Sequence, residues 1–268
     1  MFHRKLWLAI SLICFATVAQ DTVRLTNGEW APYLSQHLNH YGFASHVVSE
    51  AFAAVDVKVE YDFFPWARAH SYARRGYGAN QKWHGSLVWL KSAKRKQYFV
   101  YSQPVIFDQE VLFFRKDSPI NWHTIDDLKG LTIGAVQHVY MPLLEQAEKS
   151  GIVNLEKVGD YPIQVERILH KRVDAISINK EVGLYYLRTQ LPPEQQALIT
   201  YSPNAVQSHQ YYLVLNKKDD RNIERIELFN KGLAIIKQNG RYQQMLEGLE
   251  NGYYDKPLPK HNKTPEFD

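Results

Sequence analysis

Residues 85–104, which read GSLVWLKSAKRKQYFVYSQP, carry the pattern that most constrains the fold. The apolar run from Ser86 to Leu90 predicts a short strand, because buried strands are brief apolar runs bounded by polar residues. The basic run 91–96 follows at once, and a solvated surface is the ordinary interpretation of so short a cluster of charges. Arg95 lies in this run, and composition alone does not separate it from the neighbouring lysines.

Strands and helices alternate on both sides of this stretch. Apolar runs predict strands at 22–26, 57–63, 109–114, 132–136, 153–158, 173–178 and 211–215. Apolar residues at helical spacing predict helices at 43–55, 65–75, 142–149, 163–170, 180–188, 223–238 and 242–249. Such alternation is typical of an α/β fold with largely parallel strands.

Two extended segments, 105–111 and 209–214, join the two blocks of alternating elements. A chain that crosses from one block to the other and returns makes a two-strand hinge with a cleft between two lobes. We therefore expect a two-lobed α/β protein with two hinge crossovers. The first lobe comprises 20–108 and 212–254, the second 109–211, and 255–268 forms a flexible tail.

The N-terminus has the layout of a secretory signal peptide. Arg4 and Lys5 precede an uncharged apolar run, 6–16, and small residues at 17–19 allow cleavage before Gln20. The run is too short to span a bilayer as a helix. We expect residues 1–19 to direct export to the periplasm.

Composition excludes several classes of function. The single cysteine, Cys14, lies in the predicted signal peptide, so the mature chain would have no thiol chemistry. Removing Arg4 and Lys5 leaves 30 basic against 28 acidic residues, a balance near +2 that does not indicate nucleic-acid binding. No Gly-x-Ser-x-Gly elbow or phosphate loop is present, and the histidines are scattered. We expect a binding protein without cofactor or metal, not an enzyme.

Seven short motifs, in order, resemble the periplasmic solute-binding proteins of family 3, the polar amino-acid type, with a type II periplasmic binding fold. The resemblance covers about 22–253 and rests on 29–33 (EWAPY), 64–69 (FPWARA), 85–89 (GSLVW), 92–95 (SAKR) with 101–104 (YSQP), 127–131 (DLKGL), 172–175 (RVDA) and 239–242 (NGRY). It implies a monomer that captures a small polar, carboxylate-bearing ligand between its lobes for an ABC-type transporter.

The resemblance also implies which residues of the first lobe contact the ligand. Arg95 stands where the family places an Arg that forks onto the ligand carboxylate, and a guanidinium suits that task because its parallel donors match two oxygens. Ser92 adds a hydroxyl to the same carboxylate. Trp30 and Trp66 occupy positions of aromatic rings that cover the ligand. Further candidates are Tyr33, Leu90, Arg68 and Trp89.

On the second lobe the sequence departs from the family pattern. Gln137, His138 and Tyr140 precede the helix that begins near Pro142, whose free N–H groups would suit a carboxylate, but the usual Gly with Ser or Thr is missing. Asn179 stands where amino-acid binders have an Asp for the ligand ammonium, and an amide brings no charge. Asn179 therefore gives a ligand ammonium no charged partner at this position.

Two alternatives remain open. One is a dehydratase-like enzyme on the same fold, although no acid and base pair for the cleft can be named. The other is a ligand-sensing partner of a membrane receptor in place of a permease. The sequence does not distinguish the transport role from the sensing role.

Overall fold

The computed structural model describes residues 21–78, 81–137 and 139–256. The predicted signal peptide, and all of the predicted tail beyond Lys256, lie outside these residues. Asp255, the first residue of that predicted tail, is in the 3-10 helix η3 (Tyr253–Asp255). Within the described ranges, no helix has both the length and the apolar character needed to cross a membrane.

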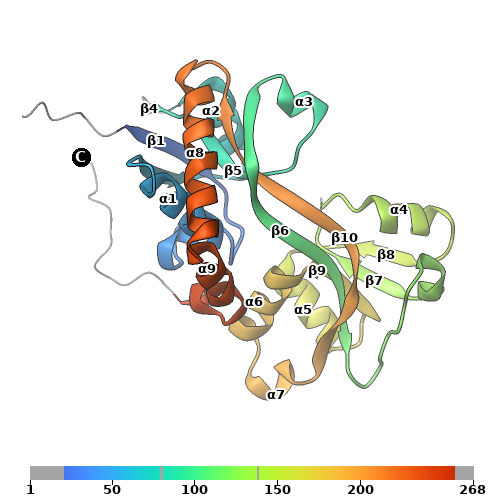
Figure 1. The fold of residues 1–268 in the computed structure, drawn as a ribbon. Helices are drawn as coiled ribbons and strands as arrows, with labels where there is room; N and C mark the ends of the chain where they lie inside the picture. The colour runs from blue at the N-terminus through green and yellow to red at the C-terminus, as the bar shows by residue number, and fades with distance from the viewer. Residues whose placement is uncertain (1–20, 79–80, 138, 257–268) are drawn as a thin grey trace, which may run out of the picture.

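The centre of the fold is one curled sheet of eight strands, in the order β2-β1-β5-β10-β6-β9-β7-β8 (Figure 1). The strands are β1 (Thr22–Asn27), β2 (Lys58–Phe63), β5 (Gly85–Trp89), β6 (Phe99–Arg115), β7 (Thr132–Ala135), β8 (Asn154–Lys157), β9 (Ala175–Asn179) and β10 (Ile199–Asn216). A separate hairpin pairs β3 (Tyr77–Gly78) with β4 (Gln81–Lys82). Strands β1, β2 and β5 are parallel, as are β7, β8 and β9.

Two long antiparallel strands, β6 and β10, run through both halves of the molecule (Figure 1). They are 17 and 18 residues long and opposed over most of their length, with Asp108 facing His209 across the pair. β10 pairs with β5 at one end, whereas β6 pairs with β9 at the other. Each lobe is thus a five-strand sheet that shares these two strands. The predicted α/β fold with two hinge crossovers is confirmed.

Helices cover the faces of the sheet. They are α1 (Phe43–Ala53), α2 (Trp66–Arg75), α3 (Ala93–Lys96), α4 (Pro142–Lys149), α5 (Tyr161–Leu169), α6 (Lys180–Gln190), α7 (Pro193–Gln196), α8 (Arg221–Gln238) and α9 (Arg241–Glu250), with 3-10 turns η1 (Asn39–Tyr41) and η2 (Ile125–Leu128). In the first lobe α1 packs closely on α8, because a Cβ added to Gly232 would lie 1.8 Å from the Ala51 carbonyl oxygen. Only glycine fits at that contact.

The hydrophobic core is continuous through the hinge. Phe52 and Phe229 pack in the first lobe with ring centroids 5.2 Å apart, and the same cluster includes Ile106 on β6 and Ile176 on β9. A second cluster around Trp122 fills the space between α4 and the outer strands of the second lobe. Burial of this apolar surface supplies the main driving force for both lobes.

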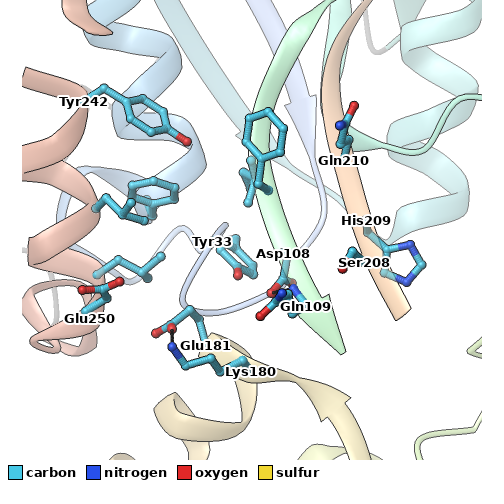
Figure 2. Close-up of a pocket in the computed structure, with 15 residues that line it drawn as sticks. Tyr33, Asp108, Gln109, Lys180, Glu181, Ser208, His209, Gln210, Tyr242 and Glu250 are labelled. Carbon is cyan, nitrogen blue, oxygen red and sulfur yellow. Dashed lines mark hydrogen bonds and ion pairs between the residues drawn. The ribbon is translucent and has the colours of Figure 1, made fainter. Parts of the chain in front are cut away.

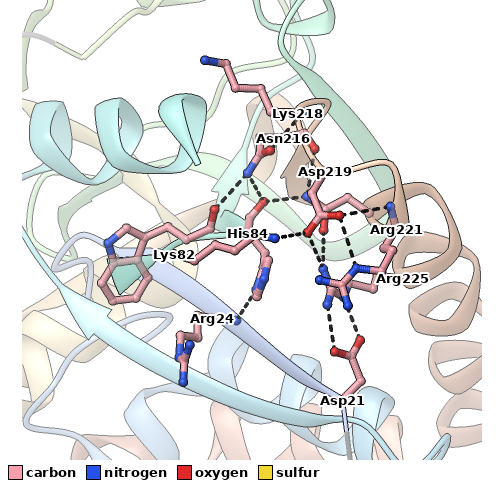
Figure 3. Close-up of polar contacts among 11 residues, drawn as sticks. Asp21, Arg24, Lys82, His84, Asn216, Lys218, Asp219, Arg221 and Arg225 are labelled. Carbon is pink, nitrogen blue, oxygen red and sulfur yellow. Dashed lines mark hydrogen bonds and ion pairs between the residues drawn. The ribbon is translucent and has the colours of Figure 1, made fainter. Parts of the chain in front are cut away.

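A polar network fixes the end of the first lobe that is remote from the hinge (Figure 3). Arg225 is 2% exposed and binds Asp21 through both carboxylate oxygens at 2.8 Å, and also Asp219 at 3.1 Å. The His84 Nδ1 accepts the backbone N–H of Arg24 at 2.8 Å, and burial, followed by the charge of Arg225, lowers the pKa of His84 to about 4. A neutral imidazole therefore serves this network at neutral pH.

Candidate ligand cleft and a second cavity

Arg95 is held in place by its own short helix. Ser92 is the N-cap of α3, and its Oγ accepts the Arg95 backbone N–H at 3.2 Å. The Arg95 Nη1 donates to the Leu90 carbonyl oxygen at 3.1 Å, and the guanidinium carbon lies 4.9 Å from the Trp89 ring centroid. The backbone and one ring therefore orient the guanidinium.

The charge of Arg95 has no carboxylate partner among the described residues. Arg188, Arg225 and Arg241 each pair with an acidic side chain, whereas Arg95 forms no ion pair within the part of the chain that the structure describes. The other arginines without an ion pair there are exposed: Arg68, Arg74, Arg75 and Arg172. Arg95 is half-buried. A partly dehydrated guanidinium with spare N–H donors has the chemistry that suits an anion, above all a carboxylate.

Trp66 packs on Trp89, and we call the surface formed by Trp66, Trp89, Leu90, Ser92 and Arg95 the wall around Arg95. Its ring meets Trp89 edge to face with centroids 5.6 Å apart, and its Nε1 donates to the Glu29 carbonyl oxygen at 3.2 Å. The Trp66 ring also lies against Gly28, where a Cβ would come within 2.3 Å of ring carbons. Five of the predicted contacts, Arg95, Ser92, Leu90, Trp66 and Trp30, thus lie on adjoining segments. Trp89, a further candidate, joins them.

Trp30 lies where the two lobes meet. Its Nε1 donates to the Tyr161 hydroxyl at 3.1 Å, and its ring packs on Tyr211 of β10 at 5.1 Å. Tyr161 belongs to the second lobe, at the start of α5, and stacks on Tyr186. Sequence reasoning did not identify Tyr161, and only its place directly after the helix cap Asp160 distinguishes it in the sequence.

The predicted contacts of the second lobe are more dispersed. Gln137 is exposed just after β7, and Tyr140 is 73% exposed. No hydrogen bond or aromatic contact joins either side chain to the wall around Arg95 within the described ranges. His138 lies outside those ranges. Asn179, at the end of β9, lies next to Asp108 and Tyr211.

The N-terminus of α4, expected to offer free N–H groups, has a carboxylate of its own. Glu145 Oε1 accepts the Met141 N–H at 3.4 Å and pairs with Lys157 at 2.7 Å. A ligand carboxylate would have to compete with Glu145 at this helix end.

A cavity of about 540 Å³ opens beside the hinge (Figure 2). Residues of β6, β10, α6 and α9 line it, together with Tyr33 and Phe43. Among the predicted ligand contacts, Tyr33 alone is in its wall, because the Tyr33 side chain is buried in the core behind Trp30 and not beside Arg95. This cavity and the wall around Arg95 are therefore two different places.

Buried carboxyl groups mark the hinge. Asp108 and Glu110 on β6 and Glu181 on α6 are all less than a tenth exposed. Burial raises the pKa of Asp108 to about 7, although the Tyr33 hydroxyl and the Gln109 backbone N–H favour its ionised form. Burial also raises the pKa of Glu181, and Lys180 opposes that rise. In the described ranges, no three His, Cys, Asp or Glu side chains are arranged to hold a metal ion.

This architecture, two lobes that share two crossing strands, is the type II periplasmic binding fold. Residues 24–249 match the bacterial extracellular solute-binding proteins, family 3. The chain belongs to that family, and the resemblance inferred from the seven motifs is confirmed.

Solved structures agree on the fold. The second substrate binding domain of a putative amino acid ABC transporter from Streptococcus pneumoniae superposes with a TM-score of 0.65 at 18% identity, covering 85% of this chain and 98% of that one. A histidine kinase sensor domain gives 0.62 at 16%, covering 89% and 98%. An ancestral amino acid-binding protein, a precursor of cyclohexadienyl dehydratase, gives 0.60 at 17%, covering 85% and 94%.

Proposed function

We propose that this protein captures a small carboxylate-bearing solute between its lobes in the periplasm and delivers it to an ABC-type permease. The observation that carries the proposal is Arg95, a half-buried guanidinium oriented by Leu90 and Trp89 and without a carboxylate partner in the described residues. Leaving such a group in place without a ligand forgoes strong charge-assisted hydrogen bonds. Ser92 and Trp66 stand beside it for the ligand's polar and apolar parts.

Binding proceeds by closure of the lobes in this account. The solute docks on the first lobe at Arg95, Ser92, Leu90, Trp30 and Trp66. The second lobe then adds contacts from Gln137, His138, Tyr140 and Asn179. The ligand favours the closed form because it touches both lobes only there. Amino-acid-like ligands lead the candidates, since the similar substrate binding domain from S. pneumoniae belongs to a putative amino acid transporter.

The role of ligand sensor is the second candidate, supported by the similar sensor domain of a histidine kinase. It uses the same capture step but a different membrane partner. Pull-down of detergent-solubilised membrane proteins on the ligand-loaded protein separates the two, because a permease or a kinase is recovered. Catalysis is not proposed.

A thermal-shift screen of amino acids, other small carboxylates and oligosaccharides tests the capture of a carboxylate. A ligand that binds only the folded state raises the melting temperature, by the equivalent of about 2.7 kcal/mol at a hundred times its Kd. We expect hits among carboxylates, lost in Arg95→Ala and kept in Lys94→Ala, an exposed cation of the same helix. Hits confined to uncharged sugars, or equal shifts for wild type and Arg95→Ala, contradict the proposal.

A further inference from the structure

The cavity beside the hinge has carboxylates that form no ion pair with the residues the structure describes (Figure 2). Asp108, Glu181 and Glu250 line it, against Lys180 and His209. Both basic groups already lie beside an acid. The Lys180 Nζ is 3.4 Å from Glu181 Oε1, and the His209 Nε2 is 3.8 Å from Oε2 of Glu110, which does not line the cavity. The cavity is therefore acidic in balance, and neither Asp108 nor Glu250 forms an ion pair among the described residues.

Two of these carboxyl groups also have a buried oxygen without a hydrogen-bond partner in the described residues, Asp108 Oδ2 and Glu181 Oε2. The Tyr33 hydroxyl and the Asn179 amide lie near Asp108, but neither forms a hydrogen bond with Oδ2. Asp108 is 5% exposed and Glu181 8%. A buried acceptor without a donor costs free energy, and a buried anion without a cation costs more. The two groups line the cavity from different elements, β6 and α6.

The rest of the wall has polar side chains, Gln109, Ser208 and Gln210, and also an apolar part. Phe43, Ile106, Tyr242, Leu246 and Leu249 form this apolar part from α1, β6 and α9. A small hydrated metal ion would gain nothing from the apolar part of the wall. An organic cation would place its hydrocarbon part there and its charge at the carboxylates.

We propose that this cavity is a second binding site, which takes an organic ammonium ion with a short hydrocarbon chain. The ammonium donates hydrogen bonds to Asp108 and Glu181, and the chain lies on Tyr242, Leu246 and Leu249. The site is independent of Arg95, because neither Arg95 nor Trp66 lines the cavity. The proposal therefore does not rest on the carboxylate ligand of the cleft.

Because α6 and α9 belong to different lobes, an ion in this site touches both of them. Its occupancy favours whichever lobe arrangement preserves the Glu181 and Leu249 contacts. Binding in the cavity and binding in the cleft are then coupled, and the coupling free energy is the same whichever ligand binds first.

Isothermal titration calorimetry with n-hexylammonium chloride tests the site. The protein used comprises residues 20–268, and the pH is about 8, where Asp108 is mostly ionised because its pKa is about 7. Hexan-1-ol, of the same shape without the charge, is the ligand control. We expect hexylammonium to bind with a Kd below about 1 mM and hexan-1-ol to bind at least about tenfold more weakly. Asp108→Asn and Glu181→Gln should each weaken hexylammonium binding by about tenfold or more.

Glu247→Gln, an exposed carboxylate on α9 that does not line the cavity, should bind hexylammonium as the wild type does, and so should Arg95→Ala. Absence of binding to the wild type, equal binding by Asp108→Asn and Glu181→Gln, or equal affinity for hexan-1-ol overturns the proposal. Loss of binding in Arg95→Ala assigns the ion to the cleft and overturns it too. Circular dichroism verifies that each variant is folded. If Asp108→Asn does not fold, the affinity of Glu181→Gln for hexylammonium tests the proposal.

Discussion

The indole N–H of Trp30 donates to the hydroxyl of Tyr161 at 3.1 Å, so the loop after β1 is joined to the start of α5 in the other lobe. These residues are 131 positions apart in the chain. A salt bridge of 2.5 Å between Arg188 Nε on α6 and Asp255 Oδ2 in η3 also joins these two parts of the molecule. The lobes therefore have direct contacts besides the hinge strands, and these contacts belong to the arrangement that the structure shows.

Replacing Tyr161 by Phe removes the acceptor of the Trp30 bond and keeps the ring. One hydrogen bond contributes about 0.5–1.5 kcal/mol, so the affinity for the cleft ligand should fall by about two- to tenfold if this bond stabilises closure. Calorimetry with a ligand from the screen measures the change. Tyr186→Phe is the matched control, because the Tyr186 hydroxyl makes no hydrogen bond in the described part of the chain while its ring stacks on Tyr161. Equal losses in the two variants would contradict a role for the bond.

Asp108 predicts a pH-dependent stability. Its pKa is raised to about 7 in the folded protein, chiefly by burial, so between about pH 4 and pH 7 the folded state holds a proton that the unfolded state has lost. The contribution of Asp108 to the free energy of unfolding is therefore largest below about pH 4 and declines as the pH rises to about 7. Tyr33, Lys180, Glu181 and His209 line the same cavity, and an Asp108 variant keeps these titratable residues.

Asp108→Asn isolates this contribution, because an amide stays neutral. Measured by urea unfolding, the variant should gain on the order of 2–4 kcal/mol relative to wild type between about pH 4.5 and pH 8. A difference between variant and wild type that is constant over this range would show that Asp108 ionises normally. Glu247→Gln, an exposed acid, should show little change.

The close contact between α1 and α8 leaves no room for a side chain at Gly232. In Gly232→Ala the new Cβ meets the Ala51 backbone oxygen, which cannot move as a flexible side chain would, and overpacking of this kind costs about 1–3 kcal/mol. Gly248→Ala on α9 is the matched control, since its nearest neighbour would be Tyr253 Cβ at an ordinary 3.4 Å. That change should stabilise by about 0.5–1 kcal/mol through helix propensity. Thermal melts that rank the two variants in the opposite order would contradict this packing.

The alternation of strands and helices was predictable because each element has its own apolar period. The hinge strands were predicted too short, with 109–114 inside β6 and 211–215 inside β10. Polar residues such as Gln103 and Ser208 interrupt the alternation where these strands leave one lobe and enter the other. The length of the strands depends on pairing with each other, which is a tertiary effect.

The wall around Arg95 was accessible through the family resemblance, in which the segment 101–104 (YSQP) follows Arg95 closely, and not through the composition of the basic run 91–96. The buried acids of the hinge were not, since DQE at 108–110 resembles a solvated turn. One signal was present: Asp108 and Glu110 alternate with Phe107 and Gln109, which places both acids on the buried face with Ile106. The cavity itself depends on α9 meeting α6, which no local pattern encodes.

The central claim, that Arg95 receives a ligand carboxylate, is tested most directly by a two-by-two titration. Wild type and Arg95→Ala are each titrated with the strongest carboxylate of the screen and with its carboxamide. We predict that either change alone weakens binding by about 30-fold or more, and that Arg95→Ala no longer distinguishes the two ligands. A full preference for the carboxylate in Arg95→Ala would contradict the account.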